Sequence, residues 1–131
     1  MIPRFRAWHK TWEEIGKVKR IRFDDDGNVT KVLFVGKKFG ANENIEEIEL
    51  MQSTGLFDKN GKEVFEGDIL KSNKYITSVF YERGAYCVKF CRTTNTTVTM
   101  NVISFIEKYK TKVIGNIYEN PEFVKDKEVD N

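Results

Sequence analysis

The chain is built mainly from residues that favour β-strands, and this bias limits the folds open to it. Valine and isoleucine together number 23 of the 131 residues, whereas alanine and leucine together number only 7. A further 10 threonines and 17 aromatic residues join the β-favouring set. Such side chains pack well on a pleated, half-buried surface. The sequence therefore predicts a mostly β fold, with a small α+β fold as the alternative, and argues against a helical bundle.

Turn residues separate the β-rich segments. Residues 24–28 (Asp-Asp-Asp-Gly-Asn) and residues 58–61 (Asp-Lys-Asn-Gly) carry the glycine that a tight hairpin turn requires. Residues 43–51 fit either a short helix or a strand, and Asn120-Pro121-Glu122 is typical of a helix start. The expected strands cover residues 4–8, 17–23, 29–35, 68–71, 76–81, 85–91, 97–102 and 112–118.

The distribution of these strands predicts two regions and a tail. Five strands fall between residues 66 and 119, about the number in a small SH3-like β-barrel. Residues 65–70 (Phe-Glu-Gly-Asp-Ile-Leu) also look like the opening strand of such a barrel, a likeness that carries no function. We therefore expect an N-terminal β-hairpin region over residues 1–62, an SH3-like barrel over 63–122 and a charged, flexible tail over 123–131.

Three segments of the chain follow one another in a distinctive order. Residues 5–8 read Phe-Arg-Ala-Trp, residues 54–70 read Thr-Gly-Leu-Phe-Asp-Lys-Asn-Gly-Lys-Glu-Val-Phe-Glu-Gly-Asp-Ile-Leu, and residues 113–122 read Val-Ile-Gly-Asn-Ile-Tyr-Glu-Asn-Pro-Glu. Together they resemble the YopX family of bacteriophage and prophage proteins. His9 and Phe57 depart from the family's usual residues. The resemblance implies a small, largely β, phage-encoded protein, and it implies no activity because the family's function is unknown.

The motif residues are read as structural. The glycines permit tight turns or close backbone approach, and the aspartates and asparagines close turns through their side chains. The turn residues assigned in this way are Gly55, Asp58, Gly61, Gly67, Asp68, Gly115, Asn116 and Asn120.

No residue pattern indicates an enzyme. One histidine and two cysteines cannot supply the four ligands of a zinc site, and we expect neither metal nor cofactor. His9 is expected at the surface or at a strand edge. The alternative is a metal-dependent nuclease, since Glu63, Glu66 and Asp68 crowd one turn and a metal gathers several carboxylates. Turn closure and solvation explain the same residues more simply.

Charge is distributed in blocks, although the net charge is only +2. Residues 1–38 and 69–120 each carry a net charge of +5, and residues 39–68 carry −6. Arg4, Arg6, Trp8 and Lys10 share one face of the first expected strand, as a patch that binds single-stranded nucleic acid would. Alternating basic residues are also common on exposed strands, and we favour that interpretation.

These observations predict a non-enzymatic accessory or regulatory protein of a phage, acting in the host cytoplasm. Its partner is expected to be a macromolecule, with a protein slightly favoured over a nucleic acid and no membrane involved. The opposed charge blocks also permit a structural role as a homo-oligomer, in which the acidic block of one copy meets a basic block of another.

Overall fold

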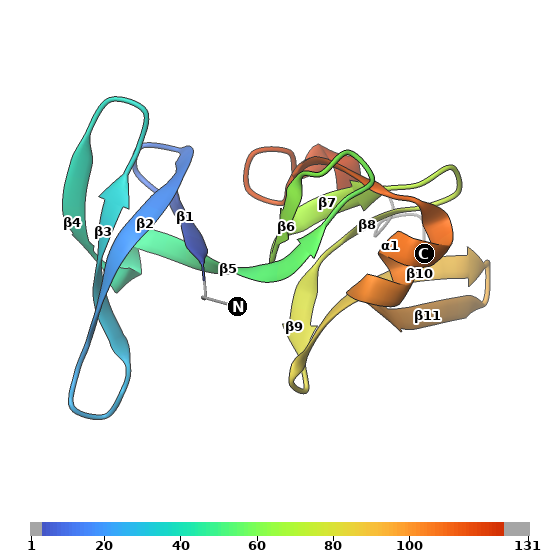
Figure 1. Ribbon diagram of the computed structural model, residues 1–131, viewed down its shortest axis with the longest axis horizontal. Helices are drawn as coiled ribbons and strands as arrows, with labels where there is room; N and C mark the ends of the chain where they lie inside the picture. The colour runs from blue at the N-terminus through green and yellow to red at the C-terminus, as the bar shows by residue number, and fades with distance from the viewer. Residues whose placement is uncertain (1–3, 125–131) are drawn as a thin grey trace. The chain divides into compact units, whose positions relative to one another are not determined.

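The computed structural model describes residues 4–124, and these residues form a mostly β structure, as expected. The chain divides into two compact units, with the division between Ser53 and Thr54 (Figure 1). The sequence placed the start of the C-terminal region at residue 63. The predicted tail lies outside the described residues from residue 125 onward.

The N-terminal unit is an antiparallel sheet in the order β4-β3-β2-β1-β5. β1 lies in its interior, paired with β2 on one side and with β5 on the other. Ala7, Val32, Phe34 and Ile48 form the buried core of this unit. Its elements are β1 (Phe5–His9), β2 (Glu14–Phe23), β3 (Val29–Val35), β4 (Gly40–Asn44), the short 3₁₀ helix η1 (Ile45–Glu47) and β5 (Ile48–Phe57), which continues into the second unit.

The C-terminal unit holds two three-stranded antiparallel sheets, in the orders β12-β7-β8 and β11-β10-β9. The end of β5 lies beside β6 (Glu63–Phe65). The remaining elements are β7 (Asp68–Lys71), β8 (Ile76–Ser78), β9 (Phe80–Glu82), β10 (Ala85–Thr93), β11 (Thr96–Asn101), helix α1 (Val102–Tyr109) and β12 (Lys112–Asn116). The buried core residues of this unit are Val64, Leu70, Val79, Val88, Phe90, Val102 and Phe105.

The two predicted hairpin turns form through the same aspartate chemistry. Asp24 Oδ1 accepts hydrogen bonds from the N–H groups of Asp26 and Asn28, each at 2.9 Å. Asp58 Oδ1 accepts from Asn60 and Lys62, each at 2.8 Å. Gly27 and Gly61 complete the turns with φ of 86° and 81°, values that other residues rarely adopt.

Several elements differ from the sequence-based expectation. Residues 97–102 were expected as one strand, but β11 ends at Asn101 and α1 begins at Val102. β4 was not expected, because Gly-Ala-Asn-Glu-Asn carries no β-branched residue and forms a strand only through pairing with β3. Residues 43–51 hold both alternatives in succession, since η1 is followed directly by β5.

Candidate functional site

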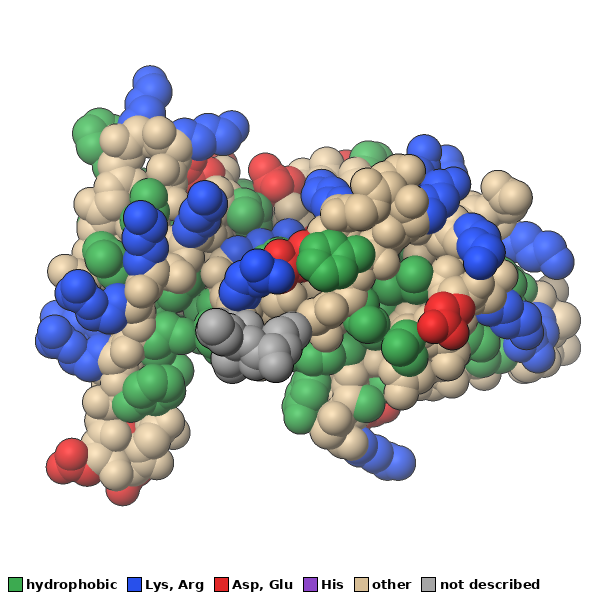
Figure 2. All heavy atoms as spheres, in the orientation of Figure 1, with side chains coloured by type: hydrophobic (Ala, Val, Ile, Leu, Met, Phe, Trp, Pro, Cys, Tyr) green, Lys and Arg blue, Asp and Glu red, His purple; other side chains and the backbone are tan. Residues whose placement is uncertain are grey.

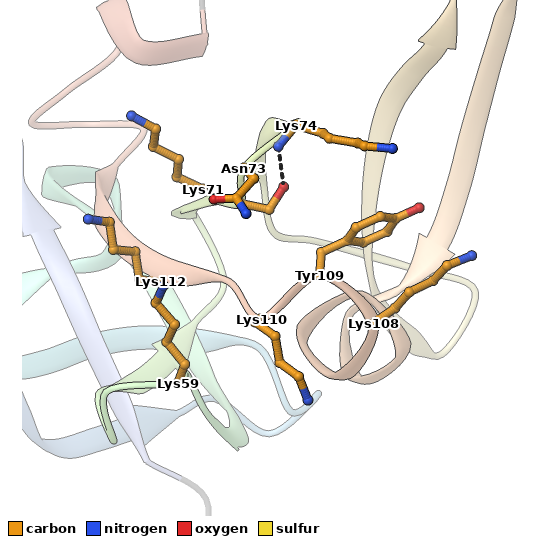
Figure 3. Close-up of a pocket in the computed structure, with 9 residues that line it drawn as sticks. Lys59, Lys71, Asn73, Lys74, Lys108, Tyr109, Lys110 and Lys112 are labelled. Carbon is orange, nitrogen blue, oxygen red and sulfur yellow. Dashed lines mark hydrogen bonds between the residues drawn. The ribbon is translucent and has the colours of Figure 1, made fainter.

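Six lysines surround one open groove in the C-terminal unit, which we call the lysine groove. Its volume is about 520 Å³, and its lining contains no carboxylate. All six lysines are exposed. The lining residues are Lys59, Lys71, Ser72, Asn73, Lys74, Lys108, Tyr109, Lys110 and Lys112 (Figure 3).

Asp58 connects two walls of the groove through hydrogen bonds. Its Oδ1 closes the turn that carries Lys59, and its Oδ2 accepts a hydrogen bond of 2.8 Å from the N–H of Val113 in β12. The N–H of Lys59 also donates to the carbonyl of Thr111, at 3.1 Å. Two segments more than 50 residues apart are thereby held together, with Lys59 and Lys112 on the same groove.

The opposite side of the groove is equally well ordered by backbone contacts. The buried Ser72 Oγ accepts hydrogen bonds from the N–H groups of Lys74 and Tyr75, at 3.2 and 3.0 Å, which shapes the β7–β8 turn. Helix α1 ends where Lys110 takes the left-handed conformation, with φ of 50° and its N–H bonded to the carbonyl of Ile106. This ending directs the chain from Tyr109 on the helix to β12.

The electrostatics of the groove are one-sided. Lys71 and Lys112 lie directly opposite each other in the β7–β12 ladder, and like charges in this position are destabilising. Within residues 4–124, no carboxylate forms an ion pair with any of the six lysines. Figure 2 shows several lysine and arginine side chains at the surface of the C-terminal unit. The groove therefore presents a concentrated positive potential to solvent.

Asp58 also gives the unit a defined response to acid. Burial acts to raise the pKa of its carboxyl group, but hydrogen bonds from the N–H groups of Val113, Lys62 and Asn60 outweigh burial and hold the pKa below its ordinary value. A depressed folded-state pKa adds stability that is present above the unfolded value of 3.8 and is lost as pH falls through the folded value.

We expect Asp58→Asn to lower the free energy of unfolding at neutral pH by about 1.5–3 kcal/mol, the range for hydrogen bonds to a charged group. Its deficit relative to the wild type should shrink as the pH falls below 3.8, because the wild-type carboxylate is then being protonated. Urea unfolding at a series of pH values measures both the loss of stability at neutral pH and its decrease in acid. Asp25→Asn, in the exposed β2–β3 turn, is the matched control. A deficit that stays constant down to strong acid would contradict this role of the Asp58 charge.

The basic patch expected from the sequence lies on the interior strand of the N-terminal sheet. Arg4 and Lys10 are exposed, Arg6 and Trp8 are half-buried, and the intervening Ala7 and His9 are buried. Lys10 donates to the carbonyl of Glu46 at 2.9 Å and forms an ion pair with Glu49 at 3.4 Å. Part of the positive charge of this patch is therefore balanced within its own unit.

The prediction that His9 is a surface or strand-edge residue is wrong. His9 is only 2% exposed, on a strand with a neighbour on each side. Its Nδ1 accepts a hydrogen bond from the N–H of Trp12 at 3.1 Å, so the proton lies on Nε2, which donates to Glu43 Oε2 at 2.7 Å. Because both ring nitrogens are occupied, neither is available to act as a general base.

The carboxylates considered for a nuclease have structural positions. Asp68 is 1% exposed, and its Oδ2 accepts a hydrogen bond of 2.7 Å from the N–H of Phe65, which closes the turn between β6 and β7. Glu63 and Glu66 are half-buried. Across residues 4–124, no cluster of three or more histidine, cysteine, aspartate or glutamate side chains is placed to hold a metal ion.

The remaining motif residues lie partly in turns and partly in strands. Gly67 lies in the turn between β6 and β7 with φ of 87°, whereas Gly55 lies within β5 with φ of 79° and Gly115 lies within β12. Asn116 Oδ1 accepts from the N–H groups of Tyr118 and Glu119, at 3.0 and 2.8 Å. Asn120 Oδ1 accepts from the N–H of Asn116 at 3.2 Å, and it packs so closely on Gly115 that an added Cβ there would collide with it. The Asn120 side chain thus closes this turn.

The lysine groove was not predicted from the sequence. The available signal was the net charge of +5 over residues 69–120, which includes five of the six lysines. Spacing along the chain did not reveal their common location, because three separate segments contribute them, around residues 59, 71–74 and 108–112.

Comparisons with known proteins identify a family and a similar solved structure. A sequence model described as YopX protein matches residues 4–125. The crystal structure of protein EF1440 from Enterococcus faecalis is similar, with a TM-score of 0.68 and 28% sequence identity over 95% of this chain and 99% of that chain. No curated protein matches the sequence. In the part of the chain that is described, no helix is long and apolar enough to cross a membrane.

Proposed function

The chain belongs to the YopX protein family, and from that premise we propose that it is a non-enzymatic phage accessory protein that binds nucleic acid through the lysine groove. It would act in the cytoplasm of the host. The single observation that carries the proposal is the groove itself, where six exposed lysines surround about 520 Å³ with no carboxylate in the lining. Lysine ammonium groups that neutralise phosphates supply most of the affinity of sequence-independent nucleic-acid binding.

Fold stability accounts for only part of this lysine cluster. Lys108 and Lys110 lie at the C-terminal end of α1, where positive charge stabilises the helix dipole. Lys59, Lys71, Lys74 and Lys112 lie outside the helix. Because Lys71 and Lys112 lie directly opposite each other, their repulsion lowers the stability of the fold. A polyanion bound between the two ammonium groups would relieve this repulsion.

The side-chain directions favour an extended ligand over a small anion. In Figure 3, Lys71 and Lys112 extend together toward one side, whereas Lys74 and Lys108 extend toward another, with Tyr109 between the latter two. A single phosphate could not contact all of these ammonium groups, whereas a chain of phosphates could. Tyr109 adds an aromatic ring on which a base can stack.

The composition of the groove favours nucleic acid as the partner, whereas the sequence alone slightly favoured a protein. Protein–protein interfaces are depleted in lysine and enriched in aromatic residues, methionine and arginine. The groove contains six lysines, one tyrosine and no arginine. An acidic protein partner remains the outcome to expect if oligonucleotides do not bind.

We also propose that the C-terminal unit is a small SH3-like barrel. β8 pairs with β7 and β9 pairs with β10, and only the buried Val79 separates β8 from β9. One bent strand therefore contributes to both sheets, and β12 returns after α1 to pair with β7. This connectivity supports a small barrel that is not fully closed, and it implies no function by itself.

The function is tested by fluorescence anisotropy of labelled oligonucleotides with the purified protein. We expect binding at micromolar concentrations or tighter that weakens steeply between about 50 and 200 mM salt, because phosphate contacts release counterions. Absence of binding at the low-salt end would overturn the proposal and return the search to protein partners.

A further inference from the structure

The N-terminal unit carries a second pocket that the lysine groove does not involve. Its volume is about 320 Å³, and it is lined by Trp12, Glu14, Lys37, Lys38 and Phe39. Trp12 is 38% exposed and Phe39 is 69% exposed, with ring centroids 6.5 Å apart in an edge-on arrangement. Two large aromatic rings are therefore displayed to solvent at one place.

Trp12 is held in position before any ligand arrives. Its ring stacks on that of His9, with centroids 4.1 Å apart and planes only 8° from parallel. The backbone N–H of Trp12 donates a hydrogen bond to His9 Nδ1, and Glu43 accepts one from His9 Nε2. The edge of the buried Phe34 completes the support at 5.7 Å. A ring fixed in this way loses little conformational freedom when a ligand stacks on it.

The charges beside these rings indicate an anionic ligand. Lys37 and Lys38 are exposed, and Glu14 is the only carboxylate in the lining. The Glu14 side chain packs so closely against Gly36 that a Cβ at Gly36 would collide with it. Two cations against one carboxylate leave the pocket positive. A ligand with a flat aromatic part and adjoining negative charge fits both features.

We propose that this pocket holds an unpaired base of a single-stranded nucleic acid on the Trp12–Phe39 pair, face-on to one ring and edge-on to the other, while Lys37 and Lys38 contact the neighbouring phosphates. Aromatic platforms beside basic side chains bind single strands in this way, and a duplex keeps its base faces inside the stack. The inference rests on the proposed function and deepens it, since it specifies the strand state of the nucleic acid. The two sites lie in different units, so variants can separate them.

Two measurements test the pocket. In a Trp8→Phe variant Trp12 is the only tryptophan, and a thymidine oligonucleotide of about ten nucleotides should quench its fluorescence while the corresponding duplex should not. In the wild-type background, Phe39→Ala should weaken single-strand binding about tenfold and leave duplex binding unchanged, since stacking is worth about 1–3 kcal/mol per base. Phe23→Ala, 58% exposed on the same unit and outside the pocket, is the matched control.

The outcomes distinguish a failure of the pocket proposal from a failure of the groove proposal. Oligonucleotide binding that depends on Lys71 and Lys112, without Trp12 quenching and without an effect of Phe39→Ala, would overturn the pocket and leave the groove standing. Equal losses for single strand and duplex in Phe39→Ala would also overturn base stacking. Absence of binding by either form of nucleic acid would overturn both proposals.

Discussion

Replacing Lys71 and Lys112 together by glutamate is expected to lower the affinity for a labelled single-stranded oligonucleotide about 100-fold at low salt. The two residues lie opposite each other on neighbouring strands and line the groove together. Each substitution replaces an attraction to phosphate by a repulsion of similar size. The fold should tolerate the change, because both side chains are exposed and the present lysine pair is itself repulsive.

Two further variants show whether the effect belongs to the groove. Lys71→Arg with Lys112→Arg keeps both charges and should bind within a few-fold of the wild type. Lys89→Glu with Arg92→Glu makes the same change in total charge on β10, at exposed positions outside the groove, and should cost much less affinity. Equal losses in the two glutamate variants would mean that net charge alone, and not the groove, controls binding.

Phe105→Ala is expected to lower the free energy of unfolding of the C-terminal unit by about 3–5 kcal/mol. Phe105 is fully buried, and its ring lies 5.3 Å from that of Phe90 and 5.1 Å from that of Tyr109. Truncation removes the ring that anchors α1 and leaves a cavity under the helix end that carries Lys108 and Lys110. Urea unfolding followed by circular dichroism measures the loss.

Ile103→Ala provides the comparison on the same helix. Ile103 is 44% exposed, and its truncation should change stability by about 1 kcal/mol or less. Similar losses for the two variants would contradict the assignment of Phe105 as the residue that fixes α1 to the core.

Local sequence signals predicted the strands and turns well, because strands and tight turns depend on short-range chemistry. The Val29–Val35 and Asp68–Lys71 strands occur as expected, and Asp58 with Gly61 marks a turn that forms. Helix α1 was missed because Val102 continues the alternation of Val98 and Met100 and so resembles one more strand residue.

Tertiary contacts determine which residues come together at the site, and the local sequence pattern does not reveal these contacts. Lys59 is brought beside Lys112 by two hydrogen bonds that close a long loop, from Val113 to Asp58 and from Lys59 to Thr111. His9 carries no sequence mark of burial, and only the pairing of β1 on both sides places it under Trp12 and next to Glu43. The basic character of residues 69–120 was visible in the sequence, but their convergence on one groove was not.

The salt dependence of single-strand affinity tests the central claim most directly, when measured for the wild type and for the Lys71→Glu, Lys112→Glu variant in parallel. Each lysine–phosphate contact contributes about 0.7 to the slope of log affinity against log salt, so the six lysines of the groove contribute about −4 to the slope of the wild type. The variant should be shallower by about 1.4. Identical slopes for the two proteins, or no wild-type binding at about 50 mM salt, would contradict the assignment of the lysine groove as a nucleic-acid site.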